Sequence, residues 1–505
     1  RNWSLSEFKV LAGTEVSDSH FLRTQNRLYG YDGEHENSLP VNYVVSYPVQ
    51  SNPNSYQKIP YQNFGRDLTD RYLSYYTTLN YQYSDRYIFN GSMRWDRSNL
   101  FGVQSNQKGV PLFSVSAGWQ LHNEKFMQSL LGIIPLLKVR ISYGLTGNVD
   151  NSLSAFTTSR LNPSTSFSSG LRFAYIVNPA NPELRWERVK VTNLGLDLGL
   201  LKNKLLFNLD LYHKEGTDLI GNAPFTGSSG VTQFYGNTGS TRTSGVDLSV
   251  TGDFRLAPVE LRSFFLFSYV RDKVTSYKVK PTILNLLSGG YAGVHPIEGK
   301  PLTGMYALPW RGLDHKDGRP IGYLNGEETK DYAAIVQTST QEDLVFLGTS
   351  RPKFSGSFRQ EIGFKNLNLS LGIAYRLGYW FRRSSVNYNT ILGGIGGHGD
   401  FARRWQKPGD EKTTQVPSLP EAVNYNEVSF YQYAQVLMEP GDHIRFQDIS
   451  LQYNWKPSSV FHQVVFNLYV DNVGMIWKKT TSNLDPDYTL AQPPRTYSFG
   501  VKLNF

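Results

Sequence analysis

The stretch LNLSLGIAYRLGY, residues 367–379, alternates without a break between large apolar side chains and small or polar ones. Leu, Ile and Tyr occupy every odd position, and Asn, Ser, Gly, Ala and Arg lie between them. Successive side chains of a β-strand point to opposite faces, so the pattern predicts a strand with one apolar and one polar face. Small and charged residues on the second face fit a water-filled interior better than a packed core.

The same alternation recurs from one end of the chain to the other. We predict strands near residues 6–15, 71–84, 86–97, 111–121, 136–147, 186–200, 203–215, 242–254, 259–271, 351–364, 367–380, 443–455, 463–471 and 495–505, with ends uncertain by about two to four residues. The 259–271 segment is the least regular, because residues 264–267 are all apolar. About fourteen such strands predict an all-β, antiparallel fold.

Composition narrows the class of β protein. The chain has 505 residues, of which 39% are hydrophobic, 18% charged and 14% aromatic, with 32 Tyr and 45 Gly. Soluble proteins carry about a quarter of charged residues. A charge-poor chain rich in Tyr and Gly is typical of a transmembrane β-barrel, whose apolar face meets lipid. The apolar stretch at residues 130–137 is much shorter than the roughly 18 residues of a membrane helix.

Short and long connections alternate between the predicted strands. Tight turns are predicted at residues 83–86, 202–204, 255–258 and 364–366. Long segments are predicted at residues 16–70, 98–110, 148–185, 216–241, 272–350, 381–442 and 472–494. Outer-membrane barrels have short periplasmic turns and long external loops, which gives the expected orientation. Residues 122–135 fall on the short-turn side, and we expect a brief helix at 124–131.

The chain finishes on an alternating strand, RTYSFGVKLNF, residues 495–505. Its apolar positions are Tyr497, Phe499, Val501, Leu503 and Phe505. We expect this strand to run toward the periplasm and to be paired at both edges, since lipid cannot satisfy an open strand edge. The pattern resembles the assembly signal that the barrel-insertion machinery reads in outer-membrane proteins.

Several longer stretches, taken in order, resemble one family. They are DRYIFNGSMRWDRSNLFG (85–102), PLFSVSAGWQLHNEKFM (111–127), LKVRISYGLTGN (137–148), NPELRWERVKVTNLGLDLGLLKNKLLFNLDLYHKEGTDLI (181–220), GKPLTGMYALPWRGLDHKDGRP (299–320) and GDHIRFQDISLQYNW (441–455). Together they span nearly the whole chain. The set resembles the SusC/RagA-type TonB-dependent transporters of the Gram-negative outer membrane.

The resemblance implies a multi-pass outer-membrane barrel of about twenty-two strands with an amino-terminal plug. It also implies gating from the periplasm by TonB, a SusD-like surface lipoprotein as lid, and import of oligosaccharides or peptides. The chain matches the carboxy-terminal barrel portion and contains no recognisable plug or TonB box. We therefore expect an amino-terminal segment, from the same polypeptide or a separate chain, to supply the remaining strands, the plug and the link to TonB.

Three features of the sequence suggest phosphate, calcium or nucleic-acid binding, and each has a simpler explanation. The glycine-rich stretch at residues 393–400 lacks the Gly-Lys-Ser/Thr ending of a phosphate loop, so we interpret it as an external loop. Asp485 and Asp487 could form half of a calcium site, but no spaced partner ligands are visible, and we predict no metal. The net charge is +9, but the Lys and Arg residues that carry it are scattered along the chain and form no dense block, which argues against nucleic acid as a partner.

Aromatic and cationic residues of the long loops are the candidate ligand contacts. Aromatic faces stack on sugar rings or peptide side chains, and arginines add hydrogen bonds. The candidates are Tyr306, Trp310, Arg311, Tyr323, Arg404 and Trp405. The alternative is that these side chains pack against neighbouring loops or a partner lipoprotein. We find no catalytic set and expect neither enzyme activity nor a bound cofactor.

Import is the leading hypothesis, and two others remain open at this point. A SusC-like barrel could instead act as a scaffold in an outer-membrane assembly or secretion complex. A third possibility is a self-contained passive channel of about fourteen strands. Outer-membrane lipids are expected partners in all three cases.

Overall fold

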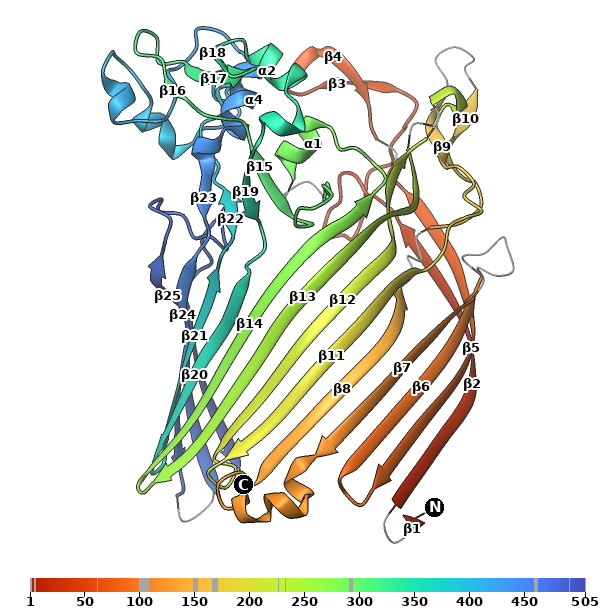
Figure 1. Ribbon diagram of the computed structural model, residues 1–505. Coiled ribbons are helices and arrows are strands. Elements are labelled where there is room, and N and C mark those ends of the chain that lie inside the picture. The colour runs from red at the N-terminus through yellow and green to blue at the C-terminus, as the bar shows by residue number, and fades with distance from the viewer. Residues whose placement is uncertain are drawn as a thin grey trace.

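The computed structural model describes residues 2–3, 6–60, 62–99, 109–148, 153–165, 171–225, 227–231, 233–289, 294–457, 462–489 and 491–504. Its main feature is one curved antiparallel sheet whose strands follow one another in chain order (Figure 1). The long loops gather at one end of the strands and the short turns at the other. The prediction of an all-β, antiparallel fold is confirmed.

Fifteen strands make up this sheet. They are β1 (Asn2–Trp3), β2 (Ser6–Gln25), β5 (Phe64–Tyr83), β6 (Tyr87–Ser98), β7 (Gly109–Gln120), β8 (Leu136–Asn148), β11 (Glu187–Leu200), β12 (Leu205–Pro224), β13 (Gln233–Leu256), β14 (Val259–Tyr277), β20 (Phe354–Phe364), β21 (Leu367–Leu377), β24 (His443–Trp455), β25 (Gln463–Lys478) and β26 (Thr496–Asn504). All but the two-residue β1 correspond to predicted strands. The irregular β14 forms as expected, because Phe265 and Phe267 share one face and Phe264 and Leu266 share the other.

Smaller elements lie in the connections. The long-loop end holds β3 (Ser46–Val49), β4 (Asn52–Lys58), β9 (Thr158–Thr165), β10 (Arg172–Asn178), η4 (Gly227–Ser229), α1 (Ile283–Ser288), β15 (Gly304–Ala307), β16 (Gly312–Leu313), β17 (Pro320–Leu324), β18 (Glu327–Thr329), α2 (Tyr332–Thr338), η5 (Gln341–Asp343), β19 (Val345–Thr349), β22 (Trp380–Arg382), α3 (Tyr388–Leu392), η6 (Gly399–Arg403), η7 (Asp410–Lys412), α4 (Tyr425–Tyr433), η8 (Gln435–Leu437) and β23 (Met438–Pro440). In the described part of the chain, no helix is both long enough and apolar enough to cross a bilayer.

Several strands extend much farther toward the long-loop end than predicted. The strand predicted at 6–15 is β2, which has 20 residues, and the one predicted at 242–254 is β13, which has 24. The prediction of a long loop at 216–241 is wrong, because β12 continues to Pro224 and β13 starts at Gln233. A tilted strand crosses a bilayer in about 9–11 residues. Beyond the bilayer both faces of a strand meet water, so its side chains no longer need to alternate. The backbone pairing therefore continues after the apolar alternation has stopped.

The short-turn end agrees closely with the prediction. Ser84 and Asp85 adopt φ values of 50° and 52° between β5 and β6, and Lys365 adopts 52° between β20 and β21. Such left-handed conformations are typical of tight hairpins. The helix expected at 124–131 is present as the 3-10 helix η3 (Lys125–Leu130), and a second one, η2 (Leu121–Asn123), precedes it.

The sheet does not close on itself. Within the described residues, β26 pairs only with β25, and β2 pairs only with β5 and the short β1. The expectation that the last strand is paired at both edges is therefore not met within the part of the chain that the structure describes. The described residues form an open segment of wall, and a closed fourteen-stranded channel is excluded for them.

The apolar residues of the predicted assembly signal lie on β26 and are exposed. Tyr497 and Phe499 have exposed fractions of 67% and 72%, and Val501 and Leu503 are also exposed. Phe505 lies outside the described residues. The register with β25 places Leu503 opposite Val464, so the apolar residues of both strands share a face.

Candidate functional site: a polar inner wall and a folded loop cap

One face of the sheet carries ion pairs that reach across an intervening strand. The Arg359 guanidinium on β20 donates to both carboxylate oxygens of Asp448 on β24, at 2.8 and 3.0 Å, and β21 lies between them. Arg140 on β8 reaches Asp210 on β12 at 3.2 Å, across β11. Side chains converge on the concave side of a curved sheet, so we assign this polar face as the inner wall.

A polar recess lies on the inner wall near the short turns. It encloses about 610 Å³. Its lining includes Asp253, Arg262, Arg359, Glu361, Ser370 and Asp448. Arg262 contacts Asp253 at 3.3 Å and Glu361 at 3.9 Å. Together with Glu260 the lining has four carboxylates and two arginines, so the recess keeps an excess of negative charge.

The opposite face of the sheet is apolar and exposed. Leu194 and Ile141 face each other on β11 and β8, with exposed fractions of 45% and 52%. Phe113 on β7 and Tyr143 on β8 lie on the same face, with ring centroids 6.0 Å apart. An apolar outer face and a polar inner face are the arrangement that a lipid-embedded, water-filled barrel requires.

Two long loops fold together at the opposite end from the turns. We call this unit the loop cap and define it as residues 278–289, 294–353 and 378–442. The backbone of Leu308 links the two loops, since its N–H donates to the Tyr433 carbonyl at 2.9 Å and its carbonyl accepts from Gln435 at 2.8 Å. Arg319 of the first loop also donates to Glu427 of the second at 3.0 Å.

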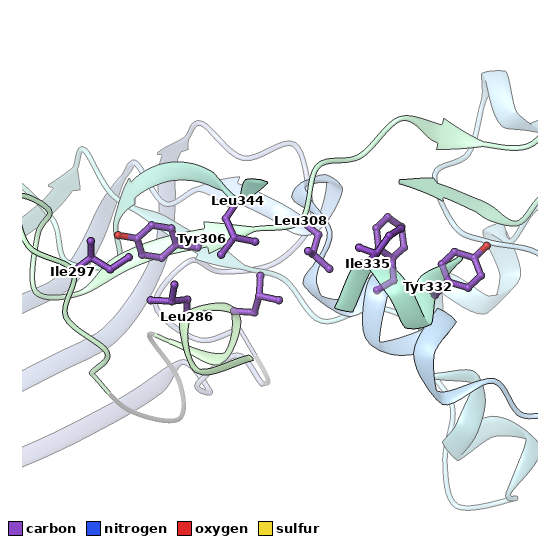
Figure 2. Packing of buried hydrophobic residues seen from close by; sticks show 9 residues of the cluster. Leu286, Ile297, Tyr306, Leu308, Tyr332, Ile335 and Leu344 are labelled. Carbon is purple, nitrogen blue, oxygen red and sulfur yellow. The ribbon is translucent and has the colours of Figure 1, made fainter. Parts of the chain in front are cut away.

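The loop cap has its own hydrophobic core. Figure 2 shows this cluster, in which Leu286 of α1 lies beside Tyr306 of β15, and Leu308 lies between this group and the side chains of α2. Its buried members are Leu286, Leu287, Ile297, Tyr306, Leu308, Tyr332, Ile335, Leu344 and Phe430. Phe430 comes from the second loop and is 0% exposed, so the core joins both loops into one folded body.

A buried carboxylate anchors the second loop. Asp400 accepts hydrogen bonds from Arg383 at 2.5 Å and Ser385 at 2.6 Å, and also from Arg403. Burial alone would raise the pKa of Asp400, but the bonds from Ser385 and the two arginines outweigh it and lower the pKa to about 2. This residue ends the glycine-rich stretch at 393–400, which is therefore tied to the cap at one end.

The predicted ligand contacts of the first loop lie in different surroundings. Tyr306 is 4% exposed in the cap core, and burial raises its pKa to about 12. Trp310 is half-buried against Tyr431, with ring centroids 5.9 Å apart. Tyr323 on β17 is half-buried, and Arg311 is exposed and paired with Glu328 at 2.6 Å.

The predicted contacts of the second loop are turned toward the cap itself. Trp405 is 8% exposed, and its indole N–H donates to Glu411 at 3.2 Å. A methyl group at Gly318 would come within 2.2 Å of this indole, so the tryptophan fills the space against the first loop. The Arg404 guanidinium lies 4.2 Å from the centroid of the Phe401 ring. The six predicted residues are thus not gathered around one recess.

The prediction missed a recess in the cap of about 510 Å³. Its lining includes Arg383, Arg403, Lys412, Thr413 and Thr414. The sequence places Arg403 beside Arg404, and only the folded loop shows which of the two faces the recess. This cationic, hydroxyl-rich surface could contact an anionic or heavily hydroxylated ligand.

Asp485 and Asp487, considered above as half of a calcium site, are engaged by cationic side chains. Asp485 accepts from Arg445 at 2.6 and 2.5 Å. Asp487 accepts from Arg376 at 2.7 Å and lies 3.2 Å from the imidazole Nε2 of His443. These bonds attach the loop after β25 to β21 and β24, which gives the carboxylates a structural role.

The curved sheet, its apolar outer face and its polar inner face define the chain as a wall of an outer-membrane β-barrel. Residues 8–473 match the TonB dependent receptor-like β-barrel family, and the chain belongs to that family. It is 27% identical over 470 residues to TonB-dependent receptor P39 of Formosa agariphila, which covers 81% of this chain and 43% of that relative. It is 28% identical over 184 residues to TonB-dependent receptor SusC of Bacteroides thetaiotaomicron, covering 35% of this chain and 18% of SusC.

Solved structures show the same fold. A structure of the RagAB peptide importer in the closed-closed state superimposes with a TM-score of 0.76 at 20% identity, covering 100% of this chain and 54% of that one. A second RagAB peptide transporter structure gives 0.74 at 21% identity, covering 99% of this chain and 54% of that one. The chain spans 43% of the length of the P39 relative, so it corresponds to part of such a protein.

Proposed function

We propose that this chain forms the carboxy-terminal barrel wall of a TonB-dependent importer of large nutrients in the Gram-negative outer membrane. The observation that carries the proposal is the polar inner wall, which opens toward a folded loop cap, within a chain of the TonB dependent receptor-like family. An energised importer needs a wet passage through the membrane and an outer surface that contacts the cargo before entry.

The partners follow from the same family. An amino-terminal segment would supply the remaining strands of a barrel of about twenty-two, close the open edges of β2 and β26, and carry the plug that TonB acts on. A SusD-like surface lipoprotein would dock on the loop cap. The open edges within the described residues and the similarity to SusC and to RagAB support this assembly.

The cargo would be an oligosaccharide or a peptide. Lys412 and the hydroxyl groups of Thr413 and Thr414 in the cap recess provide hydrogen-bond donors for hydroxyl, carboxylate or carbonyl groups. Arg383 and Arg403 of the same recess are held by Asp400, and the exposed Arg311 would have to exchange Glu328 for the cargo. Trp310 and Tyr323 are the half-buried aromatic candidates for stacking. Tyr306 and Trp405 would act indirectly, by holding the cap in shape.

Uptake by intact cells tests the proposal. Cells that produce the complete protein would receive fluorescent oligosaccharide and peptide libraries, with and without collapse of the proton-motive force. We expect energy-dependent uptake of one class. The double variant R319A/E427A, which removes a contact between the two loops, should reduce uptake, whereas R255A at an exposed short turn should not. Uptake that persists without energy would contradict the proposal and indicate a passive channel.

A further inference from the structure

The connection between β7 and β8 is longer than the tight turns beside it and contains helices. Residues 121–135, which we call the turn platform, contain η2 and η3 at the short-turn end of the sheet (Figure 1). A hairpin between neighbouring antiparallel strands needs as few as two residues. The additional residues therefore form a structure of their own, which the barrel wall does not require.

Hydrogen bonds fix the turn platform to turns on both sides. The Arg86 guanidinium donates to the Asn123 carbonyl at 3.1 Å, and the Asn123 side chain donates to the Asp85 carbonyl at 2.6 Å. At the other end, the Leu201 N–H donates to the Ile133 carbonyl at 3.1 Å. The platform thus bridges the β5–β6 and β11–β12 turns and is held in one position.

Glu124 places the platform against the outer face of the sheet. Its carboxylate accepts from the Tyr87 hydroxyl at 2.8 Å and from the Trp119 indole at 3.0 Å, and lies 3.4 Å from Arg86. Tyr87 and Trp119 are cross-strand neighbours. Gly118, one position before Trp119, pairs with Arg140 of the inner wall. Tyr87 and Trp119 therefore point outward.

The platform exposes large apolar side chains. Phe126 and Ile133 have exposed fractions of 62% each, and Leu130 and Leu131 have 42% and 36%. On the same helix, Met127 is 6% exposed and packs inward. Exposed apolar residues that gather on one rigid segment usually mark a contact surface.

We propose that the turn platform is an in-plane anchor that inserts Phe126, Leu130, Leu131 and Ile133 into the periplasmic leaflet of the outer membrane. The contact is continuous with the lipid-facing band of the barrel, because Glu124 binds directly to two aromatic residues of that band. Tyr and Trp are enriched at the depth where headgroups begin. The anchor requires that the barrel spans a membrane with its short turns on the periplasmic side, and it is independent of what the barrel imports.

The charges around the platform suit a phospholipid surface. Lys125 on the platform and Lys202 and Lys204 in the adjoining turn are exposed. Lysine side chains at a membrane rim extend their ammonium groups to the headgroups while their stems cover apolar surface. Glu124, the platform's one carboxylate, is already engaged by Arg86 and presents little negative charge to lipid phosphates. The anchor would fix the height of this part of the barrel in the bilayer.

Spin labels provide a direct test, because the chain contains no cysteine. The variants F126C and I133C, together with the control Q128C on an exposed position of the same helix, would be made in the complete protein and labelled in phospholipid nanodiscs. Accessibility to oxygen, which dissolves in lipid, is compared with accessibility to a water-soluble nickel chelate. We expect the ratio of oxygen to nickel accessibility to be several-fold higher at 126 and 133 than at 128.

Two results would overturn the proposal. High nickel accessibility at 126 and 133 would place the platform in water. Protection from both reagents would mean that protein covers it, as expected if the plug or a periplasmic partner is its true occupant. Because all three positions are exposed, labelling should leave the barrel folded, and a heat-resistant band on gels checks this for each variant.

Discussion

The barrel wall and the loop cap bury their apolar side chains in different surroundings, and this difference decides what the sequence reveals. Leu371 of the wall belongs to a face that meets lipid along the whole strand, so every second residue must be apolar. Phe430 of the cap meets Leu308 and Ile335, which lie about a hundred residues away in another loop. The identity of a wall residue can therefore be predicted from the alternation along its own strand, whereas that of a cap residue depends on packing against distant segments.

The largest expected effect is a loss of stability in the loop cap that leaves the barrel wall folded. Phe430→Ala should destabilise the loop cap by about 3–5 kcal/mol, because it removes a fully buried aromatic ring that joins both loops. We expect trypsin to cleave within residues 278–442 of the variant while the barrel still resists heat on gels. The matched control is Tyr425→Ala, since Tyr425 lies on the same helix and is 73% exposed. A variant that loses the barrel as well would show that the cap and wall fold as one unit.

The second prediction tests the two faces of the wall. Leu371→Arg puts a charge on the lipid face and should cost roughly 2–4 kcal/mol if the residue lies near the bilayer centre. Ser370→Arg lies on the inner wall, beside the polar recess, and should be milder. Folding yield into vesicles, measured by heat-modifiable mobility, compares the two variants. Equal damage from both would mean that the inner and outer faces are assigned wrongly.

The wall was predictable from local patterns, and its ends were not. The strand predicted at residues 367–380 agrees with β21 to within three residues, because lipid contact imposes the alternation. Residues 233–241 of β13 lie beyond that region, and their sequence, QFYGNTGST, carries little alternation although they pair with β12. Backbone pairing gives no sequence signal where both faces of a strand meet water.

The candidate site was only partly predictable. The sequence offered loop aromatics and arginines as candidate ligand contacts, but it could not tell which of them pack inward, since Tyr306 and Trp405 are buried by partners from other segments. Likewise Arg403 and Arg404 are equivalent in sequence, and the geometry of η6 decides that Arg403 lines the recess. The turn platform was predicted as an overlong turn with a brief helix, but its rigidity was not, because that depends on bonds to turns that are distant in sequence.

A smaller effect concerns the charge network of the cap. The pKa of Asp400 is about 2 in the folded cap and about 3.9 in an unfolded chain, so its stabilising effect is present above about pH 4 and is lost as the pH falls toward 2. The difference between the two pKa values corresponds to roughly 2.5 kcal/mol. Thermal unfolding of the cap, followed by tryptophan fluorescence, should show this loss. Asp400→Asn should be less stable at neutral pH and should lack that acid-dependent step; an unchanged acid response in the variant would assign the step to another group.

The orientation of the chain in the outer membrane is the central claim, and labelling of single cysteines on intact cells tests it most directly. Glu327 is exposed in the loop cap and Lys204 is exposed in a short turn, at opposite ends of the strands. The account predicts that a membrane-impermeant maleimide labels E327C on intact cells and labels K204C only after the outer membrane is permeabilised. Labelling of K204C on intact cells, with E327C protected, would contradict the account and invert the barrel.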